Sequence, residues 1–327
     1  MPEGDTIFRT ATRLRPVLVG GSIQAALARE PSFPADSLAG CQFSAVEARG
    51  KHLLMHLDDA RTIHSHLGMH GSWHLYRPGE PWQKDPRRAA LVLEIPAAVC
   101  VCFSPKVLQL LSADQLRRHL PLAQLGPDLL AEQLDDAEVL RRFRIHDRAP
   151  IGEALMNQTI VAGIGNVYKS EVLFLTRTDP WTTVGRLSDA QLLGIAQAAR
   201  HWLAKNLTGD PRRTRSALDG RRLWVYGRSG RPCFVCGRRI QLRRQGDSGR
   251  TTYWCPACQD QTAIGRRHDG IRIGGRDAPH DFAAIGVARL DGRHAAPVRR
   301  GILERIQPQV GFAIFRIRTM TAETDVR

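Results

Sequence analysis

Residues 1–112 combine one helical pattern with a series of strand patterns. Ile7, Ala11 and Leu14 recur at helical spacing and predict a helix that Asp5 caps and that ends near residue 18. Beyond it, short apolar or alternating runs separated by turn residues predict strands. These runs cover residues 44–57, 62–67, 72–76 and 89–103. We therefore expect a β-sandwich or barrel with a leading helix.

The pattern becomes helical after residue 112. Predicted helices cover residues 113–119, 136–144, 151–160, 166–176 and 188–206. The last of them begins with a capping box formed by Ser188 and Gln191. Apolar periodicity is lost beyond Gln261 and returns only around residues 302–317, which suggests a separate tail. The fold class expected from these patterns is a multidomain α+β protein.

Four cysteines stand in two pairs with metal-ligand spacing. Cys233 and Cys236 form one CxxC pair, Cys255 and Cys258 form the other, and 18 residues separate the pairs. Four thiolates at this spacing predict one closed, structural Zn²⁺ site, with a redox pair or an iron–sulfur cluster as the alternative. The runs between the pairs predict the β-hairpin of a zinc ribbon.

The charge balance suggests a polyanionic partner. The 327 residues include 47 Lys and Arg against 32 Asp and Glu, a net charge of +15. This excess favours nucleic acid first and an anionic membrane second, although a genome rich in arginine codons would contribute to it. No apolar run approaches the ~20 residues of a membrane span, and we expect no signal peptide. The cysteine pattern fits a reducing compartment.

The second and third residues form a candidate catalytic pair. If Met1 is removed, Pro2 becomes a free secondary amine, which is neutral at pH 7 far more often than a lysine side chain. Such an amine can add to an aldehyde carbon and form a cationic iminium. Glu3 beside it can donate or accept a proton. Alone the pair has little weight, because many chains begin with Met-Pro without this chemistry.

A glycine-rich turn separates two of the predicted helices. Gly163 and Gly165 allow a tight turn, and Asn166 can cap the helix that follows. The N–H groups at the start of that helix would form a site for an anion such as phosphate. An ordinary helix–helix turn explains the spacing equally well.

Two other short segments carry side chains suited to nucleic acid. Lys51 follows Arg49-Gly50 where a strand pattern begins, and it could reach a phosphate or a sugar. Met69 and His70 stand on a glycine-flanked turn and could fill a gap in a base stack. A solvated surface lysine and a core methionine are the alternatives.

The order of these segments is more specific than any one of them. It runs Pro2-Glu3-Gly4, Arg49-Gly50-Lys51, Gly68-Met69-His70, Ala162-Gly163-Ile164-Gly165-Asn166, Val225-Tyr226-Gly227-Arg228 and then the four cysteines. Over residues 1–261 this order strongly resembles the formamidopyrimidine-DNA glycosylase and endonuclease VIII family of base-excision repair enzymes.

The resemblance implies a division into domains. An N-terminal catalytic β-sandwich domain would cover residues 1–112, a helix–two-turn–helix DNA-binding domain 113–228, and a zinc-ribbon hairpin 229–261. Residues 262–327 lie beyond the family's common core. A disordered basic arm, a partner-binding segment and a mistranslated reading-frame extension all remain open for them.

The resemblance also implies catalytic roles. Pro2 would attack C1′ of the damaged nucleotide, expel the base and form a Schiff base. Glu3 would assist sugar ring opening and proton transfer, and Lys51 would hold a phosphate and act in the chemistry at the lesion. β- and δ-elimination would then nick the strand.

The same resemblance implies that four residues contact the DNA. Met69, with His70, would fill the hole left by the flipped nucleotide, while Asn166 and Arg250 would bind the backbone. The partner would be double-stranded DNA with damaged bases or abasic sites. The protein would be a bacterial cytoplasmic monomer acting at the nucleoid, with one structural Zn²⁺.

The details of the chain resemble the endonuclease VIII branch, most of all its actinobacterial members. The opening Met-Pro-Glu-Gly, the run 253–259 and the short stretch between Asn206 and Val225 carry this likeness. They imply oxidised pyrimidines such as thymine glycol as substrates. An 8-oxoguanine or formamidopyrimidine glycosylase, or a zinc-ribbon protein that binds DNA without chemistry, is the alternative. Thr6 departs from the family, since many relatives carry glutamate there.

Overall fold

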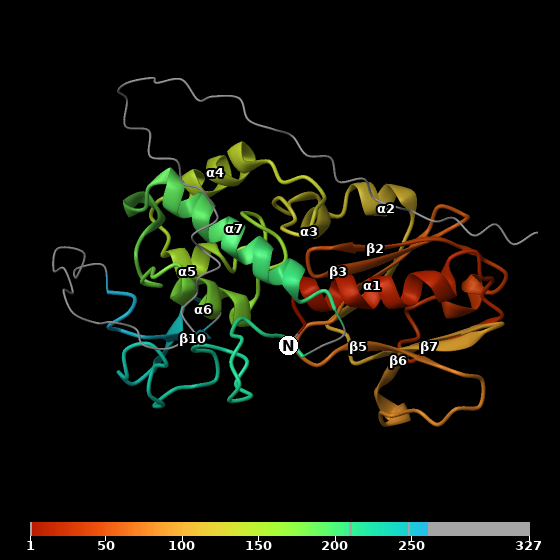
Figure 1. Cartoon of the computed structure of the whole chain (residues 1–327). Coiled ribbons are helices and arrows are strands. Elements are labelled where there is room, and N and C mark those ends of the chain that lie inside the picture. Colours follow the sequence, from red (N-terminus) through yellow and green to blue (C-terminus); the bar gives the residue numbers. More distant parts are fainter. Residues whose placement is uncertain (1, 209–210, 248, 261–327) are drawn as a thin grey trace, which may run out of the picture. The chain divides into compact units, whose positions relative to one another are not determined.

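The computed structural model describes residues 2–208, 211–247 and 249–260 (Figure 1). The extension expected over residues 262–327 lies outside the described residues. Within the described ranges, no helix is long and apolar enough to cross a membrane.

Two antiparallel four-stranded sheets and one long helix form the N-terminal part of the chain (Figure 1). The sheets have the strand orders β2-β3-β4-β8 and β1-β6-β7-β5. The strands are β1 Ala25–Ala28, β2 Phe43–Arg49, β3 His52–Leu57, β4 Thr62–His66, β5 Ser72–Tyr76, β6 Ala89–Ile95, β7 Ala98–Phe103 and β8 Val107–Leu111. The predicted sandwich is confirmed. Two of the expected runs, 44–57 and 89–103, each fold as two strands with a turn between them.

Helix α1, Gly4–Leu18, completes the core of the sandwich. Its predicted apolar residues Ile7, Ala11 and Leu14 are buried in one cluster with side chains from both sheets. The expectation that Asp5 caps this helix is wrong, because Glu3 is the N-cap residue and Asp5 lies in the first turn. The carboxylate of Asp5 is instead buried against the C-terminal half of the chain.

Helices dominate from residue 113 to residue 205. They are α2 Ala113–Arg117, α3 Leu120–Ala123, α4 Asp136–Ile145, α5 Ile151–Ala154, α6 Asn166–Leu175 and α7 Asp189–Lys205. The capping box of α7 is confirmed: the Gln191 N–H donates to Ser188 Oγ at 3.2 Å, and the Ser188 N–H donates to Gln191 Oε1 at 2.9 Å.

The helix expected over residues 151–160 is wrong in length, because α5 ends at Ala154. Asn157 explains the early end. Its side-chain oxygen accepts the N–H and the hydroxyl of Thr159, at 3.0 and 2.8 Å. Asparagine favours such turns because its side chain competes with the helical hydrogen bonds of the backbone.

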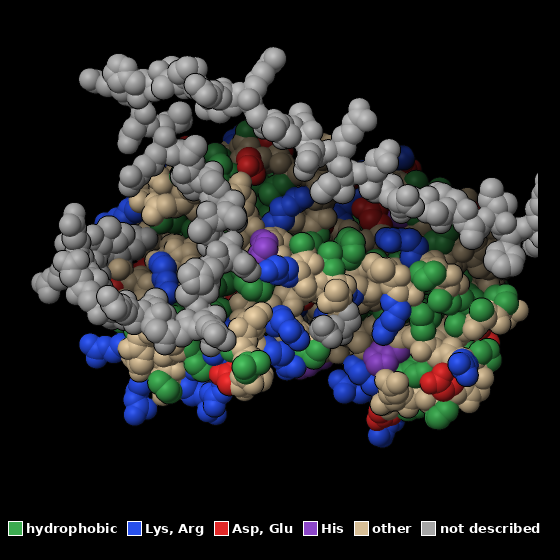
Figure 2. All heavy atoms as spheres, viewed as in Figure 1, with side chains coloured by type: hydrophobic (Ala, Val, Ile, Leu, Met, Phe, Trp, Pro, Cys, Tyr) green, Lys and Arg blue, Asp and Glu red, His purple; other side chains and the backbone are tan. Residues whose placement is uncertain are grey.

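The predicted ribbon hairpin is confirmed. Strands β9, Gln241–Gln245, and β10, Arg250–Trp254, pair antiparallel. A small core of buried side chains joins this region to α6; its members are Phe174, Trp224, Val225, Cys233, Ile240 and Cys255. In Figure 2, Lys and Arg side chains gather at the lower left, over the segment that leads from α7 into the hairpin.

Candidate active site

Glycine contacts bring together three motifs that are remote in sequence. The Gly4 N–H donates to the Gly163 carbonyl at 2.9 Å, and a Cβ at Gly4 would lie only 3.0 Å from Gly163 Cα. A Cβ at Gly50 would lie 3.0 Å from Ala162 Cβ, and the Gly50 N–H donates to the Asp128 carboxylate at 2.6 Å. The start of α1 and the β2–β3 turn therefore both lie against the turn that precedes α6.

The Glu3 carboxylate is fully buried at the N-terminus of α6. The Gly165 N–H donates to Oε2 at 2.8 Å, and the Val167 N–H donates to Oε1 at 2.9 Å. A Cβ at residue 165 would lie 2.4 Å from Glu3 Cδ, so this position requires glycine. The carboxylate thus acts as a cap supplied by a distant part of the chain.

Two expectations about this turn are corrected by that arrangement. The expected cap, Asn166, is the first residue of α6, while Gly165 is the N-cap and no side chain of its own caps the helix. The N–H groups at the start of α6, which were expected to bind a phosphate, donate to the Glu3 carboxylate instead. A carboxylate satisfies these donors in the same way as a phosphate oxygen, because the helix dipole favours any anion at this end.

Lys51 lies half-buried in the turn between β2 and β3. Burial lowers the pKa of its ammonium group to about 8, with Glu3 acting in the opposite direction and Arg250 and Arg212 adding to the decrease. These charges share one neighbourhood, so the structure brings Glu3, Lys51 and Arg250 together. Pro2, also half-buried, immediately precedes the fixed Glu3.

The residues expected to contact DNA lie where the sandwich meets the ribbon. Met69 is 51% exposed on the β4–β5 turn, and Arg250 Nη1 lies 3.1 Å from its sulfur. His70 is exposed beside it. Asn166 is buried and donates through Nδ2 to the Thr251 carbonyl at 2.8 Å, so it holds the start of β10 against α6. Its Oδ1 accepts no hydrogen bond within the described part of the chain.

Two cations at this site were not predicted from the sequence. Arg212 pairs with the buried Asp5, with Nε 2.8 Å from Oδ2. Lys169 on α6 is almost fully buried and donates from Nζ to Thr252 Oγ1 at 2.8 Å, and burial lowers its pKa to about 8. Arg212 is one of many arginines after α7, so composition alone does not single it out. The position of Lys169 three residues after Asn166 was the available signal.

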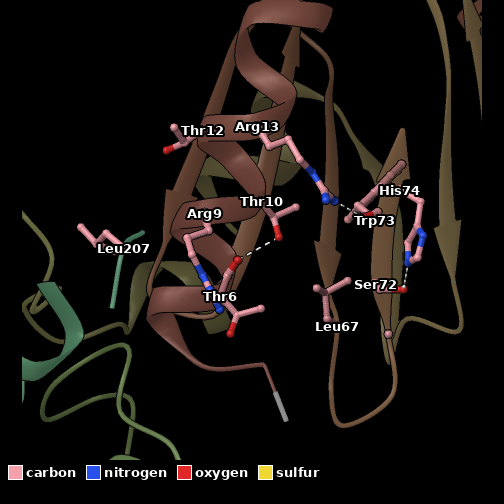
Figure 3. A pocket seen from close by; sticks show the side chains of 11 residues that line it. Thr6, Arg9, Thr10, Thr12, Arg13, Leu67, Ser72, Trp73, His74 and Leu207 are labelled. Atoms are coloured by element: carbon pink, nitrogen blue, oxygen red, sulfur yellow. Dashed lines mark hydrogen bonds between the residues drawn. The ribbon is translucent and has the colours of Figure 1, made fainter. Parts of the chain in front are cut away.

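A pocket of about 460 Å³ opens beside the first turns of α1. Thr6 and Arg13 line it from the helix, and Ser72 and His74 line it from β5 (Figure 3). Hydroxyl and guanidinium groups therefore dominate its polar wall. Its volume is within the range of small-molecule sites, about 300–1,000 Å³.

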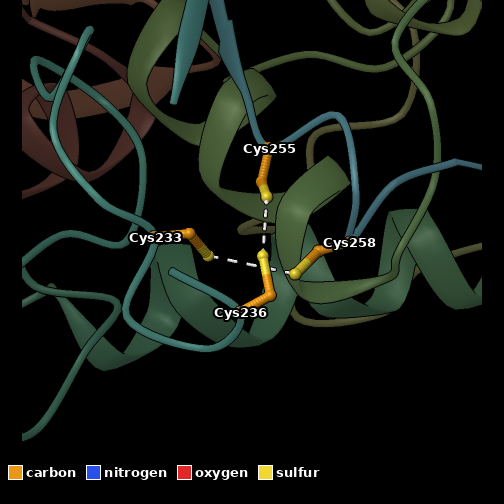
Figure 4. A group of neighbouring side chains, drawn as sticks. All are labelled: Cys233, Cys236, Cys255 and Cys258. Atoms are coloured by element: carbon orange, nitrogen blue, oxygen red, sulfur yellow. Dashed lines mark hydrogen bonds between the residues drawn. The ribbon is translucent and has the colours of Figure 1, made fainter. Parts of the chain in front are cut away.

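The four cysteines meet at one point (Figure 4). Their sulfur atoms all lie within 4.8 Å of one another, with 3.9 Å between Cys233 and Cys258 and 3.3 Å between Cys236 and Cys255. A tetrahedral zinc site with Zn–S bonds of about 2.3 Å requires sulfurs about 3.8 Å apart. The thiol set thus fits a metal of the size and preference of zinc.

Comparisons with known proteins match both halves of this fold. Residues 1–105 match the formamidopyrimidine-DNA glycosylase N-terminal domain, and residues 125–216 match the H2TH domain of the same glycosylase. The chain thus has the architecture of a DNA-repair enzyme. It belongs to the formamidopyrimidine-DNA glycosylase family.

Individual relatives agree with this assignment. "Probable endonuclease 8 2" of Streptomyces coelicolor is 38% identical over 79% of this chain and 94% of its own length. "DNA-(apurinic or apyrimidinic site) lyase Nei2" of Mycolicibacterium smegmatis is 37% identical over 79% of this chain and 99% of its own. Among solved structures, Lactococcus lactis Fpg in complex with DNA containing N7-benzyl-Fapy-dG has a TM-score of 0.68. It is 26% identical and covers 80% of this chain and all of its own.

Proposed function

We propose that this member of the family is a bifunctional DNA glycosylase and abasic-site lyase that removes oxidised pyrimidines through the amine of Pro2. The capture of Glu3 by the first N–H groups of α6 carries the proposal. Because Glu3 follows Pro2 directly, fixing its side chain also restricts where the Pro2 nitrogen points. An amine held in place beside a buried carboxylate suits covalent catalysis on a sugar, because the nucleophile is positioned and a proton-transfer group lies next to it.

The proposed chemistry starts at the Pro2 nitrogen once Met1 has been removed. The nitrogen bonds to C1′ of the damaged nucleotide while the bond from C1′ to the base breaks and the base leaves with a proton. Ring opening breaks the C1′–O4′ bond, protonates O4′ and leaves an iminium between Pro2 and C1′. Loss of a C2′ proton then expels the 3′ phosphate, and a second elimination expels the 5′ phosphate.

Glu3 and Lys51 would divide the proton transfers and the charge stabilisation. Glu3 is the buried carboxylate adjacent to the nucleophile, and it would assist ring opening at O4′. Lys51 would hold a phosphate next to the lesion in its ammonium form. Its pKa of about 8 means that a neutral amine is also accessible near neutral pH. That property suits a residue that takes part in proton transfer.

DNA binding would use the surface where the Met69 turn faces the ribbon. Met69 projects from the sandwich and would enter the base stack with His70 when the damaged nucleotide leaves it. Asn166 on α6 and Arg250 on β10 would bind the DNA backbone. The contact between Arg250 and Met69 supports this, because it shows that the two side chains reach the same space.

Two observations favour oxidised pyrimidines over 8-oxoguanine. The stretch between Asn206 and Val225 is short, and two relatives with 37 and 38% identity carry an endonuclease 8 or Nei2 name. The pocket beside α1 would receive the extruded base, and its hydroxyl and guanidinium groups suit a ring rich in carbonyl and hydroxyl groups.

The proposal includes one structural Zn²⁺ held by Cys233, Cys236, Cys255 and Cys258. All four thiolates would bind it, which leaves no open position for substrate. Bound there, the metal would hold the base of the hairpin that carries Arg250. The protein would act as a monomer on duplex DNA in the bacterial nucleoid, with the domain division 1–112, 113–228 and 229–261.

A lesion panel tests the substrate. Duplexes that carry thymine glycol, 8-oxoguanine or an abasic site are cut under single-turnover conditions with the same enzyme preparation. We expect thymine glycol to be excised at least about tenfold faster than 8-oxoguanine, which corresponds to about 1.4 kcal/mol of transition-state discrimination. Faster excision of 8-oxoguanine would assign the protein to the alternative substrate class while leaving the lyase activity in place.

A further inference from the structure

Arg212, in the segment that follows α7, reaches back to the first turn of α1. Its Nε lies 2.8 Å from Asp5 Oδ2 and its Nη2 lies 2.5 Å from Asp5 Oδ1, a two-point pairing with a fully buried carboxylate. The arginine side chain itself is only 13% exposed. This geometry uses the planar fork of arginine, which a lysine cannot reproduce.

The same guanidinium also faces the residue next to Pro2. Its Nη1 lies 3.6 Å from Glu3 Oε1. Its Cζ lies over the ring of Tyr168, 4.9 Å from the centroid, and the Tyr168 hydroxyl donates to Asp5 at 3.1 Å. One cation therefore faces two buried carboxylates, which would be costly to keep ionised without it.

This arrangement suggests a task beyond stability. Asp5 lies in the turn of α1 that begins at Gly4, so its pairing with Arg212 fixes the direction in which α1 starts. Glu3 is fixed at the same point by α6. The Pro2 nitrogen is attached to Glu3, and displacement of a reacting atom by about 1 Å can cost about a hundredfold in rate.

We propose that Arg212 is a positioning residue for the Pro2 and Glu3 chemistry, acting through Asp5 and Glu3 from the segment after α7. The proposal rests on the function proposed above. It assigns to that segment the task of holding the nucleophile in line with the lesion. Arg212 touches no reacting atom in this account.

Several charged or titratable side chains surround Glu3. They come from the β2–β3 turn, α6 and the segments after α7; they are Lys51, Tyr168, Lys169, Arg212 and Tyr226. Within this set, Arg212 makes an ion pair with Glu3. Removing it should release the carboxylate on that side and lower the rate of the step at Pro2.

Single-turnover borohydride trapping on an abasic-site duplex, with enzyme in saturating excess, tests the proposal. Arg212→Gln should reduce the trapping rate at least about thirtyfold. Arg212→Lys should restore part of the rate. The matched control is Arg61→Gln, which removes an Arg–Asp pair of 2.6 Å from the β3–β4 turn, away from the site. It should trap like the wild-type protein.

The outcomes separate this proposal from the function on which it rests. If Arg212→Gln traps with the rate of Arg61→Gln, or loses only DNA affinity, the positioning role is overturned and the proposed function stands. If Arg212→Gln does not fold, Asp5→Asn takes its place, since it keeps the shape and removes the pair. A wild-type rate in Asp5→Asn then overturns the proposal. A wild-type protein that forms no adduct overturns both.

Discussion

Replacing Glu3 by glutamine should loosen the contact between α1 and α6. The carboxylate accepts the backbone N–H groups of Gly165 and Val167 at 2.8 and 2.9 Å and that of Tyr168 at 3.4 Å. It is fully buried, so solvent does not screen these bonds. Hydrogen bonds to a charged group contribute about 1.5–3 kcal/mol each, which gives about 3–6 kcal/mol for the two shorter bonds. Relief of the cost of burying a charge offsets part of this loss. We expect a net decrease of about 2 kcal/mol in the free energy of unfolding.

The substitution also points an amide N–H₂ group at backbone N–H groups that need an acceptor. It replaces the carboxylate that we propose for proton transfer by an amide. Base excision should therefore fall by about 10² or more, the usual contribution of a positioned acid or base. Urea unfolding followed by circular dichroism measures the first effect, and single-turnover excision of thymine glycol measures the second. Glu47→Gln is the matched control, because Glu47 lies on β2 with 38% of its side chain exposed. Its effect on stability should stay below about 1 kcal/mol. A Glu3→Gln protein that matches this control in both assays would contradict the proposed roles of Glu3.

Three other predictions concern the remaining parts of the site. For Lys51, whose pKa is lowered to about 8, the ammonium form exists below that pH and is lost above it. Wild-type affinity for an abasic duplex should therefore exceed that of Lys51→Gln at pH 7, with a salt slope larger by about 0.9. The difference should disappear well above pH 8, and a difference independent of pH would contradict it. Chelation of zinc or Cys255→Ser should weaken DNA binding, while circular dichroism should still show the strands of the sandwich. Normal DNA binding by a verified zinc-free protein would refute the role of the ribbon. Met69→Ala should change stability by less than about 0.5 kcal/mol, because the side chain is 51% exposed, yet slow excision from duplex more than from single-stranded DNA. An equal effect on both substrates would argue against a wedge.

Local patterns predicted those parts of the fold that local interactions determine. The capping box of Ser188 and Gln191 could be predicted because both of its hydrogen bonds span three residues. The ribbon hairpin could be predicted because the two CxxC pairs lie on either side of it in the sequence. The helix expected at 151–160 failed because the turn at Asn157 ends it, a competition that apolar periodicity does not register.

The contacts that assemble the site were not predictable in this way. Glu3 and Gly165 are 162 positions apart. No local sequence pattern indicates that the side chain of Glu3 caps helix α6, which begins directly after Gly165. The pairing of Asp5 with Arg212 spans 207 positions. The region around Arg212 contains many other arginines, and composition does not indicate which of them pairs with Asp5. Such contacts are set by tertiary packing, which also desolvates Lys51 and Lys169 and lowers the pKa of each to about 8.

The most direct test of the account is to locate the covalent bond to DNA. The protein with Met1 removed is incubated with an abasic-site duplex and borohydride, and the adduct is digested and mapped by mass spectrometry. The same chain with an extra N-terminal segment that leaves Pro2 internal serves as the control. We predict an adduct on the Pro2 nitrogen of the processed protein and none on the extended form. Equal trapping of the two forms, or an adduct mapped to Lys51, would contradict the assignment of Pro2 as the nucleophile.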